Sequence, residues 1–352
     1  MKPIRNAKKP IENMKDVAER AGVALSTVSR ALSRPDLVSA ETRKLVARTV
    51  EELGYTVNAA TSSLRGERTG VVLVLIPDVS NPFVGMVLKG VQKRAREVGY
   101  SVLIGDDGDD RELGTSYARQ VAARRADGII LLTGTRPQSG ASALKEAGLR
   151  SRVVAISEGV GEAVPPVGVD NVRAAMGAVA YLVSMGHRRI MHFAGPRGGK
   201  LTRDRLAGYQ LALAEADVPF DGELVRYCDF TAAAGHGAAG ALAALPERPT
   251  ALFAASDHIA IGAMSGLRDR GLSVPADVSV VGFDDVDSGP VACPALTTVH
   301  QPRLDMGFIA MSMLMEMLDG STLVHDRILP TRFVVRDSVR RLGEPLGLVP
   351  TP

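Results

Sequence analysis

The stretch "MKDVAERAGVALSTVSRALSRPDLVSAETRKLVARTVEELGY", residues 14–55, decides the fold of the N-terminal part of the chain. Asn13 precedes it and can cap a helix over "MKDVAERA", because its side-chain oxygen can accept a first-turn N–H. Gly22 stops that helix, a second helix follows a short turn, and a third begins at Ser39 and closes at Gly54. Two short helices joined by a tight turn, with a supporting helix behind them, form a helix-turn-helix arrangement.

The second helix, "LSTVSRALS", has a polar start and an apolar inner face. The positions expected to face the core are Val28, Ala31 and Leu32. This leaves Leu25, Ser26 and Arg30 outside, as in a recognition helix that enters the major groove of DNA by its N-terminus. The guanidinium of Arg30 can grip O6 and N7 of guanine, although an ordinary surface helix would show the same spacing. The core face of the third helix is expected to hold Leu45, Val46, Val50 and Leu53.

From Val71 onward, apolar runs alternate with segments of helical period. The runs are "GVVLVLIP", "YSVLIGD", "DGIILLTG", "RVVAIS", "RRIMHFAG", "TALFAAS" and "VSVVGFDD". Each run is apolar on both faces, which is typical of parallel strands buried between helices, and so predicts a doubly wound α/β fold. The length of this part indicates two lobes, with a ligand cleft at the carboxyl ends of the strands.

The predicted domain organisation has four parts. They are a helix-turn-helix domain at 1–57, a hinge or linker at 58–69, a core at 70–341 and a tail at 342–352. Within the core we expect an N-lobe of about 70–169 plus 301–330, and a C-lobe of about 170–299 plus 331–341.

Charge and composition limit the possible functions. Residues 1–68 hold 13 Lys and Arg against 8 Asp and Glu, whereas the whole chain holds 42 against 39. A basic N-terminal module on a nearly neutral body points to nucleic acid. No apolar run reaches the ~18 residues of a membrane span, and no signal-peptide segment follows the basic N-terminus, so we expect a cytoplasmic protein with no membrane partner.

Catalytic and metal-binding motifs are missing from the sequence. The two cysteines have neither disulfide-framework nor zinc-site spacing, and the six histidines form no H-x-x-x-H pair. The loop "GPRGGKL", residues 195–201, departs from the phosphate-loop pattern, and no G-x-S-x-G elbow occurs. We therefore expect no metal, no cofactor and no enzyme activity.

Several polar and aromatic residues follow predicted strands, where doubly wound lobes converge on ligands. They are Phe83, Arg205, Phe230, Asp257 and Asp284. A pairing of Arg205 with Asp284 could engage the donors and acceptors of a small polar ligand, while the two phenylalanines supply flat apolar faces. Helix caps and satisfied surface charges are the alternative interpretation of the same residues.

The whole chain resembles the lactose-repressor (LacI/GalR) family of bacterial transcription regulators. The motifs "KDVAERAGV", "TVSRAL", "VSAETR" and "LGY" stand at family spacing in the N-terminal part. "IPDVSNPF", "DGIILL", "VDN", "GHRRI", "RLAGY", "SDHIAIGAM", "VPADVSVVGFDD" and "PALTTVHQP" then follow in family order, so the resemblance covers roughly residues 13–341. It implies a helix-turn-helix headpiece and a two-lobed core like that of periplasmic binding proteins.

The resemblance implies a role for individual residues at the DNA. Leu25, Ser26 and Arg30 would read base edges, Thr27 and Ser29 would hold phosphates or pack the turn, and Asn58 would contact the DNA backbone. In the family, the linker forms a hinge helix in the minor groove, where Leu64 would wedge into a base step while Arg65 neutralises phosphate. The chain departs from the family at Ala24, where a capping Ser or Thr is usual, and at Val57, where proline is usual.

The resemblance also assigns the cleft. Arg205 and Asp284 match the principal effector contacts of the family, and Phe83, Phe230 and Asp257 match further wall positions. Ser256 stands where sugar-responsive relatives can carry Asn, and Ser157 stands where an acidic ligand contact sometimes occurs. Asp170 would lie at the hinge between the lobes. These substitutions leave the identity of the effector open.

The sequence thus predicts a homodimeric repressor that binds a pseudo-palindromic, double-stranded operator. A small-molecule effector, a sugar or a sugar derivative, would bind between the lobes and control DNA affinity. The alternative is a solute-binding protein of the periplasmic sugar-binding type, which shares the two-lobed fold but would need a signal peptide. Such a protein would not carry residues 13–68.

Overall fold

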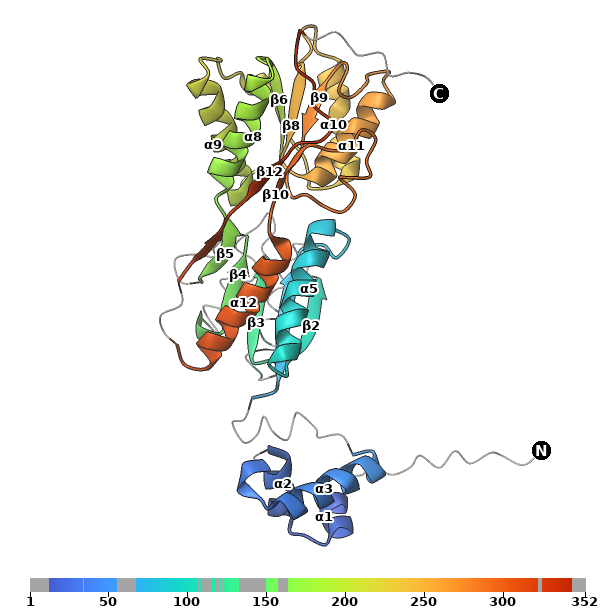
Figure 1. The fold of residues 1–352 in the computed structure, drawn as a ribbon, viewed down its shortest axis with the longest axis vertical. Helices are drawn as coiled ribbons and strands as arrows, with labels where there is room; N and C mark the ends of the chain where they lie inside the picture. The colour runs from blue at the N-terminus through green and yellow to red at the C-terminus, as the bar shows by residue number, and fades with distance from the viewer. Residues whose placement is uncertain are drawn as a thin grey trace, which may run out of the picture. The chain divides into compact units, whose positions relative to one another are not determined.

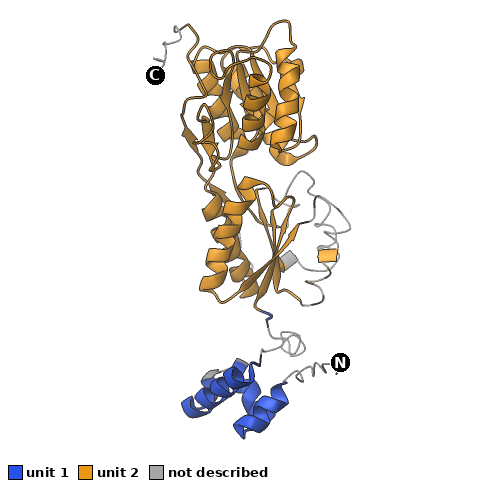
Figure 2. Cartoon of the chain, turned by 90° about the vertical axis from the view of Figure 1, so that its right-hand side faces the viewer, with its two compact units in different colours: residues 1–69 blue, residues 70–352 orange. Residues whose placement is uncertain are grey.

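The computed structural model describes residues 13–33, 35–55, 68–106, 108, 116–117, 119, 121, 123, 125–132, 150–157, 164–321 and 325–343. The chain divides into two compact units, residues 1–69 and residues 70–352 (Figure 2). Each unit has a hydrophobic core of its own, and each is described by itself below.

The first unit confirms the predicted helix-turn-helix arrangement. It contains α1 (Met14–Ala21), α2 (Leu25–Ser33), a short 3-10 helix η1 (Pro35–Leu37) and α3 (Ala40–Leu53) (Figure 1). Asn13 caps α1 by accepting the backbone N–H of Lys15 at 2.8 Å, and Asp16 accepts the backbone N–H of Asn13 at 2.7 Å. This reciprocal capping fixes the start of α1. Its core is built from Val17, Ala18, Val28, Ala31 and Val46.

Leu45 is a correction to the expected core face of α3. Its side chain is 46% exposed, whereas Val46 is buried and Val50 and Leu53 pack partly buried against the core. Positions 46, 50 and 53 form one stripe at helical period, and position 45 lies about 100° to one side of it. An apolar residue beside the stripe therefore remains in solvent.

The N-lobe of the second unit is a six-stranded parallel sheet in the order β11-β5-β4-β3-β1-β2. Its strands are β1 (Val71–Ile76), β2 (Ser101–Asp106), β3 (Gly128–Leu132), β4 (Val153–Ile156), β5 (Pro166–Val169) and β11 (Arg327–Leu329), with η2 (Arg150–Arg152) before β4. Helices α5 (Pro82–Glu97) and α12 (Arg303–Leu318) lie side by side against one face (Figure 1). Together with the C-lobe described next, whose sheet has helices on both faces, this confirms the predicted doubly wound α/β core.

The C-lobe is a four-stranded parallel sheet in the order β7-β6-β8-β9, with helices on both faces (Figure 1). Its strands are β6 (Ile190–Ala194), β7 (Val225–Tyr227), β8 (Ala251–Ala254) and β9 (Ser279–Val281), with η3 (Gly222–Leu224) before β7. Its helices are α8 (Asn171–Ser184), α9 (Lys200–Glu215), α10 (Ala232–Ala243) and α11 (Asp257–Arg268).

The chain crosses between the lobes at three places. The first crossing joins β5 to α8, and the second joins β10 (Thr298–His300) to α12. The third joins β11 to β12 (Arg332–Val334), which pairs antiparallel with β10. Each lobe is therefore assembled from segments that are distant in the sequence.

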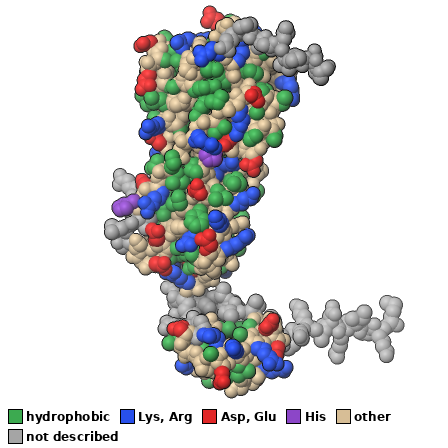
Figure 3. Space-filling model, viewed as in Figure 1, with side chains coloured by type: hydrophobic (Ala, Val, Ile, Leu, Met, Phe, Trp, Pro, Cys, Tyr) green, Lys and Arg blue, Asp and Glu red, His purple; other side chains and the backbone are tan. Residues whose placement is uncertain are grey.

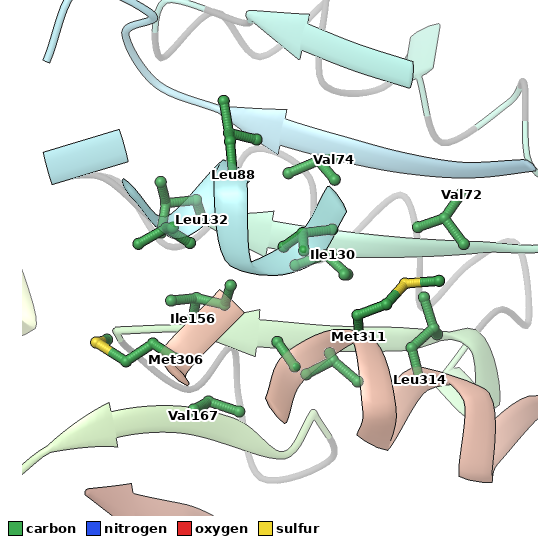
Figure 4. Packing of buried hydrophobic residues seen from close by; sticks show 14 of the residues in the cluster. Val72, Val74, Leu88, Ile130, Leu132, Ile156, Val167, Met306, Met311 and Leu314 are labelled. Carbon is green, nitrogen blue, oxygen red and sulfur yellow. The ribbon is translucent and has the colours of Figure 1, made fainter. Parts of the chain in front are cut away.

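The core of the N-lobe shows why its two helices can approach closely. Val74, Ile130 and Ile156 of the sheet pack under α5 and α12 (Figure 4). At the crossing of these helices, a Cβ on Gly90 would clash with the carbonyl oxygen of Leu304.

On the outside, basic and acidic side chains are interspersed over the visible face of the second unit (Figure 3).

Candidate functional site

Helix α2 presents the side chains that the sequence assigned to base reading. Leu25 is 47% exposed, and Ser26 and Arg30 are also exposed. Ala24 has no capping side chain, and at the start of the helix the backbone N–H groups of Thr27 and Val28 donate to the Ala24 carbonyl at 2.8 and 3.1 Å. Because Leu25, Ser26 and Arg30 are exposed, the outer face of α2 is available to a partner.

Arg30 folds back along its own helix. Its Nε donates to the Ser26 carbonyl at 3.3 Å, and its Nη2 donates to Ser26 Oγ at 3.5 Å. Both bonds are at the long end of the hydrogen-bond range, so little is lost when the guanidinium extends toward a base. Thr27 is half-buried and Ser29 is buried, and for Ser29 the burial favours packing of the turn over a phosphate contact. Asn58, Leu64 and Arg65, like Val57, lie outside the described residues.

A cavity of about 80 Å³ lies where the strand ends of both lobes meet. Six of the seven residues assigned to the effector line it, namely Phe83, Ser157, Arg205, Phe230, Ser256 and Asp284. The other lining residues are Pro77, Asn81, Val84, Leu132, Leu201 and Gln301. The N-lobe wall is mainly apolar, whereas the C-lobe wall carries the charged pair. A ligand there would meet one apolar face and one polar face.

Arg205 is held rigidly on α9. Its Nε donates to Asn171 Oδ1 at 3.0 Å, Nη1 donates to the Ala255 carbonyl, and the guanidinium carbon lies 3.8 Å from the centre of the Phe283 ring. Its Nη1 lies 4.0 Å from Asp284 Oδ1, and both side chains are less than a tenth exposed. The pair is aligned before any ligand arrives, which lowers the cost of binding.

Asp284 follows β9 in an unusual backbone conformation, with φ of 125°. Gln301 Nε2 donates to its Oδ1 at 2.7 Å. Burial raises the pKa of Asp284 to about 7, against the opposing effect of the nearby Arg205 charge. A non-glycine residue at such a φ is costly and tends to occur at functional sites.

Asp257 lies inside the C-lobe and does not line the cavity. Its Oδ1 accepts the hydroxyl of Thr298 at 2.5 Å, and its Oδ2 accepts the backbone N–H of Val286 at 2.9 Å. Burial raises the pKa of Asp257 to about 6, although these hydrogen bonds oppose it. Asp257 therefore supports the wall from behind by fixing the chain that follows Asp284.

Comparison with known proteins agrees with this geometry. The family of bacterial regulatory proteins of the lacI type matches residues 13–58, and the periplasmic binding protein-like domain matches residues 179–339. The HTH-type transcriptional repressor CytR of Escherichia coli (strain K12) is 36% identical over 330 residues, which are 94% of this chain and 96% of CytR. The chain belongs to the LacI family.

Solved structures of LacI-family proteins cover both units of the chain. The lac repressor dimer, bound to operator and the anti-inducer ONPF, has a TM-score of 0.81 and 27% identity, over 94% of this chain and 100% of that one. The complex of the transcriptional regulator CelR with cellobiose has a TM-score of 0.72 and 33% identity, over 93% and 99%. These family relatives share the fold of both units.

Sequence reasoning missed the six other lining residues of this LacI-family cleft and one residue behind it. Leu201 and Gln301 line it, and Asn171 orients Arg205 from behind. Gln301 belongs to the second crossing, and its motif "HQP" contained the signal, since a polar residue between a strand and a helix start often faces a cleft. Leu201 gave no such signal, because an apolar residue in a helix is usually a core residue.

Ser256 and Ser157 reach the cleft in different ways. Ser256 caps α11, where its Oγ accepts the backbone N–H of Ile259 at 3.2 Å. Ser157 follows β4 with φ of 76°, in the left-handed region. Asn81 caps α5 by accepting the N–H of Phe83 at 3.0 Å. Two polar wall residues, Ser256 and Asn81, therefore already have hydrogen-bond partners within the protein.

Proposed function

We propose that this LacI-family regulator is a repressor whose affinity for an operator is set by a small molecule in the cavity between its lobes. The observation that carries the proposal is the buried pair of Arg205 and Asp284, aligned in a cleft of a chain that also bears an exposed recognition helix. Asn58, Leu64 and Arg65 are proposed as further DNA contacts. The names of the relatives are those of regulators, so a role without catalysis is part of the proposal.

The effector that we propose is a neutral, polyhydroxylated molecule, a sugar or sugar derivative. Among the described residues of the lining, Arg205 is the one basic side chain and it faces Asp284, so the lining offers no cluster of basic groups for a phosphate. The cavity of about 80 Å³ is smaller than the ~300 Å³ at which drug-sized pockets begin. Binding therefore requires the two walls to separate or side chains to move, which couples occupancy to the arrangement of the lobes.

A homodimer is proposed because two half-sites require two recognition helices. Strand β2 is at an edge of the N-lobe sheet, and its Leu103 and Ile104 are 55% and 45% exposed. Apolar side chains on an edge strand favour pairing with another chain. Replacing both residues with lysine should halve the mass measured by sedimentation equilibrium, and an unchanged mass would place the dimer contact elsewhere.

Selection of genomic DNA fragments on the purified full-length protein, followed by footprinting, tests the regulatory role. A pseudo-palindromic site should be recovered, and Arg30→Ala should weaken binding and relax base preference at one position of each half-site, by ~1–3 kcal/mol. Recovery of fragments with no common site would contradict the proposal. Without a DNA site, the expectation that the protein acts in the cytoplasm, where the DNA is, would lose its basis.

A thermal-shift screen of sugars, sugar phosphates and purines tests the cleft. We expect a neutral sugar or sugar derivative to raise the melting temperature, and the same compound to change operator affinity. The alternative, a solute-binding protein, predicts the first effect without the second.

No helix among the residues placed in the structure is long and apolar enough to span a membrane.

A further inference from the structure

Asp285, the neighbour of Asp284, ties the C-lobe to two of the three crossings. Its Oδ2 lies 2.9 Å from His300 Nδ1 at the end of β10, and its Oδ1 accepts Arg336 Nη2 at 2.6 Å just beyond β12. Its backbone carbonyl accepts Arg303 Nη2 at 2.6 Å, at the start of α12. One residue of the C-lobe therefore touches both ends of the second crossing and the end of the third.

The charges around Asp285 favour these bonds. Burial by itself raises a carboxyl pKa, but the hydrogen bonds from Arg336 and His300 outweigh it and hold the pKa of Asp285 below its ordinary value. The ionised carboxylate can only accept, so Nδ1 of His300 carries the proton in their bond. Arg336 also donates to the Leu296 carbonyl at 2.8 Å, which fixes it to the C-lobe chain before β10.

Asp284 and Asp285 share one peptide bond and point in different directions. Both have positive φ, 125° and 58°, so the chain turns sharply between the end of β9 and the next loop. The Asp284 carboxylate lines the cavity, where it meets Arg205 and Gln301 of the second crossing, and the Asp285 carboxylate points away from the cavity to His300 and Arg336. A movement of Asp284 in the cavity therefore acts directly on the bonds of Asp285.

The other member of the cavity pair is tied to the remaining crossing. Arg205 Nε donates to Asn171 Oδ1 at 3.0 Å, and Asn171 Nδ2 donates to the Val169 carbonyl at 3.3 Å. Val169 ends β5 and Asn171 begins α8, so this bond spans the first crossing. The pair that lines the cavity is thus connected to all three crossings, through one or two hydrogen bonds and, for the third crossing, also through the peptide bond between Asp284 and Asp285.

We propose that Asp285 is a positioning residue that holds the second and third crossings in one arrangement, and that transmits a displacement of Asp284 to the angle between the lobes. It touches no ligand. Its regulatory consequence rests on the effector role proposed above for the cavity, but its hold on the crossings does not. The element that both sites bias is the hydrogen-bonded group of Asp285, His300, Arg303 and Arg336.

The test compares Asp285→Asn with Asp287→Asn in the full-length protein. The asparagine side chain has one acceptor oxygen and no charge, so it cannot accept from His300 and Arg336 with two separate oxygens as the carboxylate does. Asp287 is a matched control, because its side chain is 83% exposed. Among the described residues its one ion pair is with Arg303, at 3.5 Å. Arg336→Lys keeps the charge but loses the planar fork, and serves if Asp285→Asn fails to fold.

The distance between the lobes is measured by double electron–electron resonance. Spin labels are placed on exposed Lys89 of α5 and Glu215 of α9, with Cys228 and Cys293 changed to serine and labelled subunits diluted into unlabelled protein. We expect Asp285→Asn to broaden or split the distance distribution, and Asp287→Asn to leave it unchanged. Hydrogen exchange at the Gln301 amide, which donates to the Asp284 carbonyl at 3.4 Å, should become about tenfold faster.

A double-mutant cycle then tests the transmission. Asp284→Asn alone should also alter the distance distribution, but it should add little to Asp285→Asn, because both changes act on one linked group. Additive effects would show that Asp285 does not transmit a displacement of Asp284, and an unchanged distribution in Asp285→Asn would show that it serves stability at most; either result would overturn the proposal. Neither measurement uses DNA or a ligand, so failure of the proposed regulatory function would leave this result intact.

Discussion

Replacing Asp284 with asparagine should remove a large part of the dependence of stability on pH. In the unfolded chain an aspartate ionises near pH 4, whereas in the folded protein burial delays ionisation of Asp284 to about pH 7. Its contribution to the free energy of unfolding is therefore present below pH 4 and is lost as pH rises through 7. The amide of the Asp284→Asn variant is neutral at every pH and has no such loss.

The magnitude follows from the size of the shift. Three pKa units at ~1.4 kcal/mol each give about 4 kcal/mol in all, of which about 2–3 kcal/mol is lost between pH 5 and pH 8. Asp257, with a pKa raised to about 6, titrates together with Asp284, so the loss is spread over the titration of the pair. Any change in packing that the substitution causes shifts the stability of the variant equally at each pH.

Urea unfolding followed by far-UV circular dichroism measures the effect, since the chain has no tryptophan. The free energy of unfolding of Asp284→Asn minus that of wild type should become more positive by about 2–3 kcal/mol between pH 5 and pH 8. Asp287→Asn, which removes a carboxylate that lies in solvent, is the control and should not change the slope. Parallel curves for wild type and Asp284→Asn would refute the reasoning.

Three further predictions concern other parts of the chain. Gly90→Ala should lower the free energy of unfolding by ~1–3 kcal/mol, since its Cβ meets backbone of α12, while Gly85→Ala, at an open position of the same helix, should raise it by up to ~1 kcal/mol. Arg205→Ala should abolish the thermal shift caused by a screened ligand, and Arg203→Ala, exposed on the same helix, should retain it; equal loss in both would remove Arg205 from the site. Ala24→Ser should stabilise the first unit by ~1 kcal/mol in thermal unfolding by capping α2, and no change would mean that the helix start does not admit a cap.

Local signals were sufficient for the first unit. Asn13, Gly22 and Gly54 fix helix ends through bonds to residues within five positions, and such bonds can be predicted from the sequence. Leu45 was placed wrongly because an i, i+1 pair of apolar residues leaves open which of the two continues the stripe. The strand runs of the core were equally plain, because both faces of each parallel strand are apolar.

The remainder of the cleft depends on contacts that the sequence does not encode locally. Asn171 and Arg205 are 34 positions apart, and Asp285 and Arg336 are 51 apart, so their pairing follows only from the crossings of the chain. The crossing strands are three residues long and mixed in polarity, which leaves no periodicity to detect.

The pair "DD" at 284–285 shows where sequence reasoning ends. Successive residues after a strand point in different directions, so one of two adjacent aspartates faces the cleft and the other faces away, but the sequence treats them alike. The structure separates them by backbone conformation and partners: Asp284 meets Arg205 and has a raised pKa, whereas Asp285 meets Arg336 and has a lowered one. Opposite shifts on adjacent residues of one type mean that their surroundings assign the roles. One carboxyl is left able to respond to a ligand, and its neighbour is committed to holding the crossings.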